Sequence, residues 1–338
     1  MERNGGRFRL PRRRWPRPIA YQRVLIFLPV VLLLAGMAGY GIWSDETHSS
    51  SANIRPGKMQ MDGGSATGKA LNQRPVPMKV IRHGHQVHIT MVSEETRVQI
   101  APGKYYNAWT FDGTVPGPTL QLQQGDHVTL TLRNLDPKMS HSIDLHAALV
   151  SPNQTFVDVP PGKTKTIHFT AKVPGVYMYH CASMPMLQHI GNGMYGAVIV
   201  TAPGQPKPDY TIVQSEFYPG GNYDKMKNGQ PSYVVFNGKA FQYVSHPLRA
   251  KVGKPLTIAF VNAGPNEVSA FHIVGSVLSD VEASGNPKNH FYDVSTQAVV
   301  PGEGVLIRVT FQQPGTYNMV THVMRDADKG ATGSIVVT

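Results

Sequence analysis

The chain has 338 residues, one cysteine and a formal net charge of +11 at pH 7. Residues 1–23 hold eight arginines and one glutamate, and so carry most of that charge. The rest of the chain is close to neutral, which gives no reason to expect nucleic-acid binding. A single cysteine excludes an intrachain disulfide framework, and the length is sufficient for two domains.

Residues 24–43 contain no charged side chain and are mostly apolar. A run of about 20 such residues can cross a bilayer. The arginines precede it, so the positive-inside rule predicts a basic cytoplasmic tail over 1–23 and an anchored, extracytoplasmic body. The alternative is a signal segment, whose cleavage would leave a secreted or periplasmic protein.

Residues 44–75 are rich in Ser, Gly, Asn and Lys without periodicity, which predicts a flexible tether. From residue 76 onward, short runs of Val, Ile, Thr, Leu and Tyr alternate with Pro-Gly and Gly-Asp turns. This pattern is typical of β-sandwiches. The predicted fold class is therefore all-β.

An internal repeat divides this β region. Pro161-Gly162 recurs as Pro301-Gly302, and Pro174-Gly175 recurs as Pro314-Gly315. The repeat predicts two tandem Greek-key sandwiches over 76–203 and 209–338. The second copy has Thr321 where the first has Cys181, and Ala331 where the first has Met194.

The only cysteine begins a potential metal-binding loop. Cys181 is followed by His189 and Met194, and His141, on an expected earlier strand, supplies a second imidazole. Two imidazoles, one thiolate and a weak axial thioether form a blue-copper site. Zinc is the alternative metal, but structural zinc usually has paired cysteines or histidines at short spacing. The sequence therefore predicts copper bound by His141, Cys181, His189 and Met194.

Strand alternation predicts a second group of candidate metal ligands. His180 and Cys181 are adjacent, so a strand would point their side chains to opposite faces. His141 and His146 differ by an odd number of positions, which in a continuous strand separates them in the same way. Asp144 and His146 share a face, which places a carboxylate beside a second metal. His83, His85 and His88 lie on or near the first strand and have no predicted role.

The set His141, Asp144, His146, His180, Cys181, His189 and Met194, on two tandem cupredoxin-like domains, resembles the copper-containing nitrite reductases, in particular the branch with a short ligand loop. The resemblance covers roughly residues 76–338. It implies two copper ions per chain: a type 1 ion on His141, Cys181, His189 and Met194, and a type 2 ion on His146, His180 and His322. It further implies that His322 comes from a neighbouring subunit of a homotrimer.

The resemblance also implies that Asp144 and His272 are catalytic, that nitrite is reduced to nitric oxide, and that a cytochrome c or a cupredoxin supplies electrons. Two other functions remain open at this point. A laccase-like oxidase would need a His-Cys-His triad, whereas Ala182 follows Cys181 here. A membrane-tethered copper electron-transfer protein would have no use for the second group of histidines.

Overall fold

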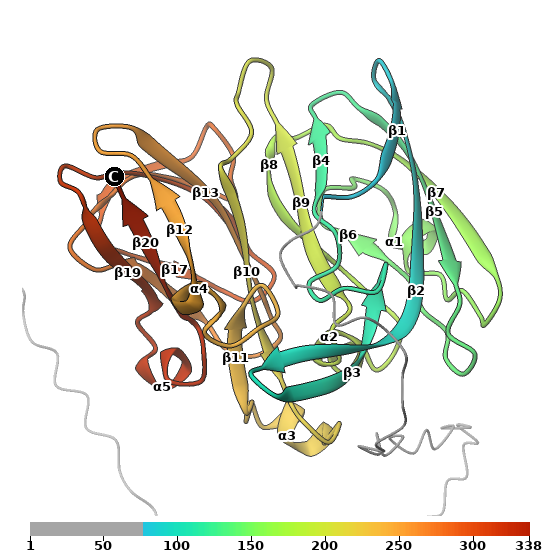
Figure 1. The fold of residues 1–338 in the computed structure, drawn as a ribbon. Coiled ribbons are helices and arrows are strands. Elements are labelled where there is room, and N and C mark those ends of the chain that lie inside the picture. Colours follow the sequence, from blue (N-terminus) through green and yellow to red (C-terminus); the bar gives the residue numbers. More distant parts are fainter. Residues whose placement is uncertain (1–76) are drawn as a thin grey trace, which may run out of the picture. The chain divides into compact units, whose positions relative to one another are not determined.

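The computed structural model describes residues 77–338, whose regular secondary structure is mainly β-strand (Figure 1). The predicted tail, membrane segment and tether over 1–75 lie outside the described residues. Within 77–338, no helix is sufficiently long and apolar to span a membrane. The strands form four sheets, and no sheet takes strands from both sides of residues 202–209.

The first pair of sheets is formed by residues 80–201. One sheet has the strand order β1-β2-β5-β7 with β3 also paired to β2, and the other has the order β4-β9-β8-β6. In β5 the side chains of Val128, Leu130 and Leu132 are buried between the sheets while the intervening ones face outward, as the period of two requires. The strands are β1 Val80–His83, β2 Gln86–Ala101, β3 Lys104–Phe111, β4 Leu120–Gln123, β5 His127–Asn134, β6 Asp144–Leu145, β7 Thr164–Thr170, β8 Gly175–His180 and β9 Tyr195–Thr201.

The second pair of sheets is formed by residues 210–337. Their orders are β11-β10-β13-β18-β15-β16 and β12-β20-β19-β14-β17. The strands are β10 Tyr210–Phe217, β11 Tyr233–Phe236, β12 His246–Ala250, β13 Pro255–Gly264, β14 Ser269–Ile273, β15 Leu278–Ala283, β16 His290–Val294, β17 Thr296–Val299, β18 Gly304–Thr310, β19 Gly315–Thr321 and β20 Thr332–Val337. Short helices occur in the connections: α1 Pro152–Thr155, α2 Met186–Gly191, α3 Tyr223–Lys227, α4 Gln242–Ser245 and α5 Met324–Ala327.

The two pairs of sheets pack directly on each other. Apolar side chains from both, including Val176, Ile199, Val213 and Leu306, form one buried cluster. The backbone N–H of Val176 donates to the carbonyl of Ser284 at 2.9 Å, which joins β8 to the second half. Burial of this kind, at about 25 cal/mol per Å² of apolar surface, makes independent movement of the halves costly.

The two halves make hydrogen bonds at equivalent positions. The Asn134 side chain donates to the carbonyls of Met139 and Val159 at 2.7 and 2.8 Å. The Asn262 side chain donates in the same manner to two carbonyls, at 2.8 and 2.9 Å. The Cys181 N–H donates to Met194 O at 3.1 Å. In the second half, the equivalent Thr321 N–H donates to Ala331 O, also at 3.1 Å.

The same bonds show what replaces the other two predicted ligands in the second half. Met194 N donates to His189 O at 3.2 Å, whereas Ala331 N donates to Asp326 O at 3.1 Å, so Asp326 occupies the position of His189. Ser269, whose partner is Val299, occupies the position of His141. None of the four substituted side chains is an imidazole or a thiolate, so the second half has no blue-copper ligand set.

Candidate copper centres

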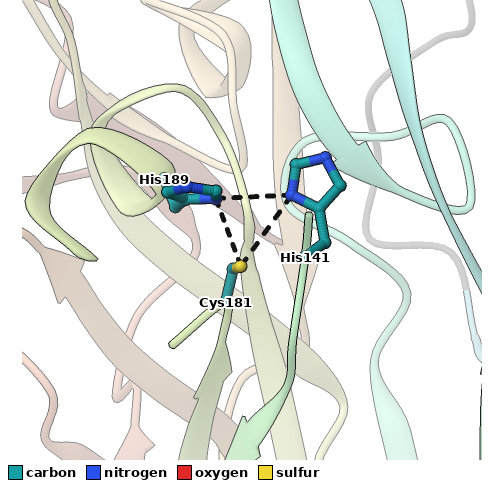
Figure 2. Close-up of side chains that lie close together, drawn as sticks. All are labelled: His141, Cys181 and His189. Carbon is teal, nitrogen blue, oxygen red and sulfur yellow. Dashed lines mark hydrogen bonds between the residues drawn. The ribbon is translucent and has the colours of Figure 1, made fainter. Parts of the chain in front are cut away.

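His141, Cys181 and His189 converge in the interior of the first half (Figure 2). Cys181 Sγ lies 3.2 Å from His189 Nδ1 and 3.9 Å from His141 Nδ1, and the two Nδ1 atoms are 3.3 Å apart. An ion at 2.0–2.3 Å from three atoms in a plane needs them roughly 3.6 Å apart. The triangle therefore has the size that a metal ion requires, and all three side chains are at most 1% exposed.

Local structure places these ligands at the end of one strand and in the loop beyond it. β8 ends at His180, and Cys181 follows directly. The chain then turns into α2, which presents His189, and returns so that Met194 N donates to His189 O at 3.2 Å. Met194 is completely buried, in the same core cluster as Cys181. Met194 is thus available as the axial thioether of this set.

Burial keeps the imidazoles of this group neutral. Burial, with a smaller contribution from the neighbouring His141, lowers the pKa of His189 to about 3. Burial also lowers the pKa of His141, although Asp136 opposes that shift. Neutral imidazole is the form that binds metal. Burial raises the pKa of the Cys181 thiol, so copper binding must displace its proton.

Three further residues hold the ligands in place, two through their side chains and one through its backbone N–H. Asp136 Oδ2 lies 3.0 Å from His141 Nε2, which leaves Nδ1 directed at the centre of the triangle. Ser142 N donates to Cys181 Sγ at 3.4 Å. The Trp109 ring packs against His189 with the centroids 4.9 Å apart. Asp136 and Trp109 were not among the predicted site residues. The only signal for Asp136 was its place five positions before His141, and nothing local pointed to Trp109.

A second group lies on the other side of the His180–Cys181 peptide. His146 Nε2 and His180 Nε2 are 3.2 Å apart, and Asp144 Oδ2 lies 3.8 and 3.6 Å from them. The Nδ1 of His180 is 3.0 Å from the Cys181 carbonyl oxygen, which fixes its ring. Burial lowers the pKa of His180, and the adjacent His146 adds to that effect. The predicted grouping of Asp144, His146 and His180 is therefore observed.

The prediction of a continuous strand from His141 to His146 was wrong. β6 contains only Asp144 and Leu145, and His141 is held by an isolated bridge to Val159. The reason is local. The Ala182 N–H donates to the Ser142 hydroxyl at 3.1 Å instead of to a backbone carbonyl, as it would between two paired strands. The two histidines still belong to different groups, but loop geometry rather than strand alternation separates them.

His272 and His322 come together in the second half. β14 carries His272, and His322 follows the end of β19, with the ring centroids 5.6 Å apart. His272 Nδ1 lies 2.6 Å from Ser295 O, and His322 is exposed. Among the described residues, the cluster of Asp144, His146 and His180 does not include His322. The five side chains predicted for the second site thus form two groups within one chain.

The donor types of the two groups fit copper. Two imidazoles with one thiolate and a buried thioether match a type 1 site, and soft sulfur ligands favour copper over magnesium or calcium. The second group offers two Nε2 atoms beside an oxygen and lacks a third imidazole. A third group in the described region, Asp280, Glu282 and His290, is different, because Arg308 donates to both carboxylates at 2.5 and 2.6 Å and offsets part of their negative charge.

Comparisons with known proteins agree with this donor chemistry. The Multicopper oxidase family matches residues 91–205 and, in a second profile, residues 206–338. A copper-containing nitrite reductase of Neisseria gonorrhoeae is 35% identical over 271 residues, which are 75% of this chain and 68% of that protein. Another from Pseudomonas chlororaphis is 31% identical over 74% of this chain and 78% of its own length. The structure of a copper nitrite reductase from Nitrosomonas europaea superposes with a TM-score of 0.72 at 40% identity, covering 75% of this chain and 94% of that one.

Fold, ligand chemistry and profiles together define a protein of the multicopper oxidase class. Within that class, the chain belongs to the family of copper-containing nitrite reductases.

Replacement of Asp136 by Asn tests how the His141 tautomer is set. Asp136 Oδ1 accepts the N–H groups of Lys138 and Met139 at 2.8 and 3.1 Å, so an Asn would keep its oxygen there and direct its NH₂ at His141. That NH₂ would donate to Nε2 and move the ring proton to Nδ1, where the metal binds. We expect Asp136→Asn to lower copper affinity at this site by about 10- to 100-fold. Copper titration followed by visible absorbance measures the loss; unchanged affinity would contradict this role.

Proposed function

We propose that the chain reduces nitrite to nitric oxide by one electron, with a type 1 copper receiving the electron and a type 2 copper holding the substrate. The main support for this proposal is that a single peptide bond, between His180 and Cys181, joins the two ligand groups. His180 Nδ1 also lies only 3.0 Å from Cys181 O. When bound, copper would supply redox exchange at the first group and a positive centre for the anion at the second.

The residues of the first group act by holding a fixed geometry. Buried Cys181, His141 and His189 do not need to reorganise between redox states, because each is also held by protein contacts. The donor of the electron is proposed to be a cytochrome c or a cupredoxin. We infer an extracytoplasmic, membrane-anchored location from residues 1–43 of the sequence alone.

The second group must also deliver protons. Nitrite, one electron and two protons give nitric oxide and water, and neither metal supplies protons. Asp144 is the candidate for direct donation, because its Oδ2 lies within 4 Å of both His146 Nε2 and His180 Nε2. His272 is proposed to act through a bridging water. A positioned acid typically contributes 10²–10⁴-fold to such a step.

Metal content and nitrite turnover test the proposal as a whole. The expected result is two coppers per chain with two distinct paramagnetic signals, and nitric oxide formed from nitrite with a reduced electron donor. Copper binding without nitrite turnover would favour the electron-transfer alternative. Turnover of phenolic substrates with oxygen would favour an oxidase.

A homotrimer is proposed because the second site is incomplete within one chain. His146 and His180 lack a third imidazole, and the exposed His322 stands apart from them. A head-to-tail ring of identical subunits places the second half of one copy against the first half of the next. His322 of the neighbouring copy then completes each site.

Mixed trimers test this arrangement. Co-expressed His146→Ala and His322→Ala chains should regain about a quarter of the native sites, because random pairing unites two intact halves at one interface in four. Each variant alone should be inactive. The matched control is a mixture of His146→Ala and His180→Ala chains. Both substitutions lie in the first half, so no interface combines two intact halves and no activity should return. Equal activity in both mixtures, or an active monomer, would rule out sharing.

A further inference from the structure

The loop that carries His189 and Met194 is bound to β3, a strand that provides no copper ligand. Asn192 lies in this loop between the two ligands, directly after the end of α2. Its carbonyl accepts the Trp109 N–H at 3.0 Å, and its side-chain Oδ1 accepts the hydroxyl of Tyr106. Two bonds from one strand therefore hold the residue that separates these ligands.

The hydroxyl of Tyr106 and its acceptor are both buried. Tyr106 and Asn192 are each 1% exposed. Burial raises the pKa of Tyr106, so the hydroxyl keeps its proton and donates the hydrogen bond to Asn192 Oδ1. A buried amide oxygen that loses its donor has no solvent to replace it, which makes the loss unfavourable. Removal of this hydroxyl therefore acts directly on the position of Asn192.

The glycines on either side of Asn192 leave the loop little room for movement. Gly193 has a φ of +118°, and a Cβ atom added there would lie 3.0 Å from Trp109 O. Gly191 packs against Met226 of α3, whose sulfur would lie 3.1 Å from an added Cβ. Close packing of this kind transmits a displacement to the neighbouring residues. A shift of Asn192 is therefore passed on to the ligands before and after it.

Backbone hydrogen bonds connect Asn192 to the ligands of the first group. Met194 N donates to His189 O at 3.2 Å, which closes a short ring that contains Asn192. Cys181 N donates to Met194 O at 3.1 Å, so the thiolate ligand is joined to the same ring. The Tyr106 hydroxyl thus acts on these ligands through Asn192.

The ring of Tyr106 is itself held by the second half of the chain. Its centroid lies 5.3 Å from that of Phe217, the last residue of β10. Both rings belong to the buried apolar cluster that the two halves share. A ring packed in this way cannot follow the loop, so its hydroxyl is a fixed point to which the loop is bound.

We propose that Tyr106 is a positioning residue for the copper of the first group, and that its hydroxyl, through Asn192, fixes His189 and Met194 relative to Cys181. This role rests on the copper site of the proposed function and adds to it a residue from outside both ligand groups. The axial ligand tunes the electronic properties of a blue-copper site. A displaced Met194 is therefore visible in the spectrum as well as in the affinity.

Tyr106→Phe in the full chain tests the proposal, because it removes only the hydroxyl. Copper should still bind, but about tenfold more weakly, the scale on which outer partners of metal ligands contribute. Competition with a chelator, followed by the visible thiolate–copper absorption, measures the affinity, and the band itself should move from its native position. Asn192→Ala removes the acceptor and should have the same effects. Because the two groups form one bond, the double variant should lose no more than either single variant.

Tyr218→Phe is the matched control. Tyr218 is completely buried and its hydroxyl also donates to a side-chain oxygen, that of Glu216, but it lies in the second half. This variant should lose thermal stability, while its copper affinity and absorption stay native. Equal losses of affinity in the two tyrosine variants, or native affinity and absorption in Tyr106→Phe and Asn192→Ala, would overturn the proposal. A native protein without any thiolate–copper band would overturn the copper site itself, and the role of Tyr106 with it.

Discussion

Asp144→Asn is expected to reduce nitrite turnover by on the order of 10²-fold or more while both coppers stay bound. Asn keeps the size of the side chain and its oxygen but has no acidic proton. A 10²-fold loss corresponds to about 2.7 kcal/mol of transition-state stabilisation. Stopped-flow or steady-state nitrite reduction measures the change, and metal analysis checks occupancy. His272→Asn should also slow turnover, with copper retained.

The control for Asp144 is Asp224→Asn. Asp224 is exposed and pairs with Lys227 at 2.8 Å on α3, and it belongs to neither ligand group. Its replacement should leave turnover near the native value. Near-native turnover of fully loaded Asp144→Asn would show that protons reach nitrite by another route.

Cys181→Ala is expected to remove the intense visible absorption of a thiolate–copper bond completely, because the chain has no other cysteine. Donor-driven turnover should fall to background, while the paramagnetic signal of the second copper persists. The proposed second copper would be held by nitrogen ligands on the other side of the peptide. Absorption and electron paramagnetic resonance of the copper-loaded variant measure the two outcomes.

Thr321→Ala is the matched control for this variant. Thr321 occupies the position of Cys181 in the second half, is equally buried, and accepts the Ala270 N–H at 3.1 Å. Its loss should leave the visible band unchanged. A native copper-loaded protein without such a band would contradict the role of Cys181 as a ligand.

The local part of the candidate sites could be predicted from sequence. Cys181, His189 and Met194 lie within one loop, so their spacing alone carries the ligand pattern. The split between His180 and Cys181 follows from their adjacency. The repeat also identified Thr321 and Ala331 as the replaced ligands, because Pro-Gly turns mark equivalent positions in both halves.

The parts that depend on distant pairing could not be predicted in this way. Trp109 reaches His189 from β3, a contact between residues 80 positions apart that only the packed sheets create. Strand alternation also gave the wrong expectation for residues 141–146, because the hydroxyl of Ser142 accepts the Ala182 N–H and interrupts the strand.

The second half shows what the copper-binding loop needs in order to form. It keeps the backbone bonds of that loop, from Thr321 to Ala331 and from Ala331 to Asp326, without any of the ligands. The loop shape is therefore a property of the packed polypeptide and not of the metal, in contrast to small zinc domains that fold only on metal binding. Maturation can then proceed in a fixed order, with a completed scaffold first and metal insertion last, which frees folding of the chain from the local supply of copper.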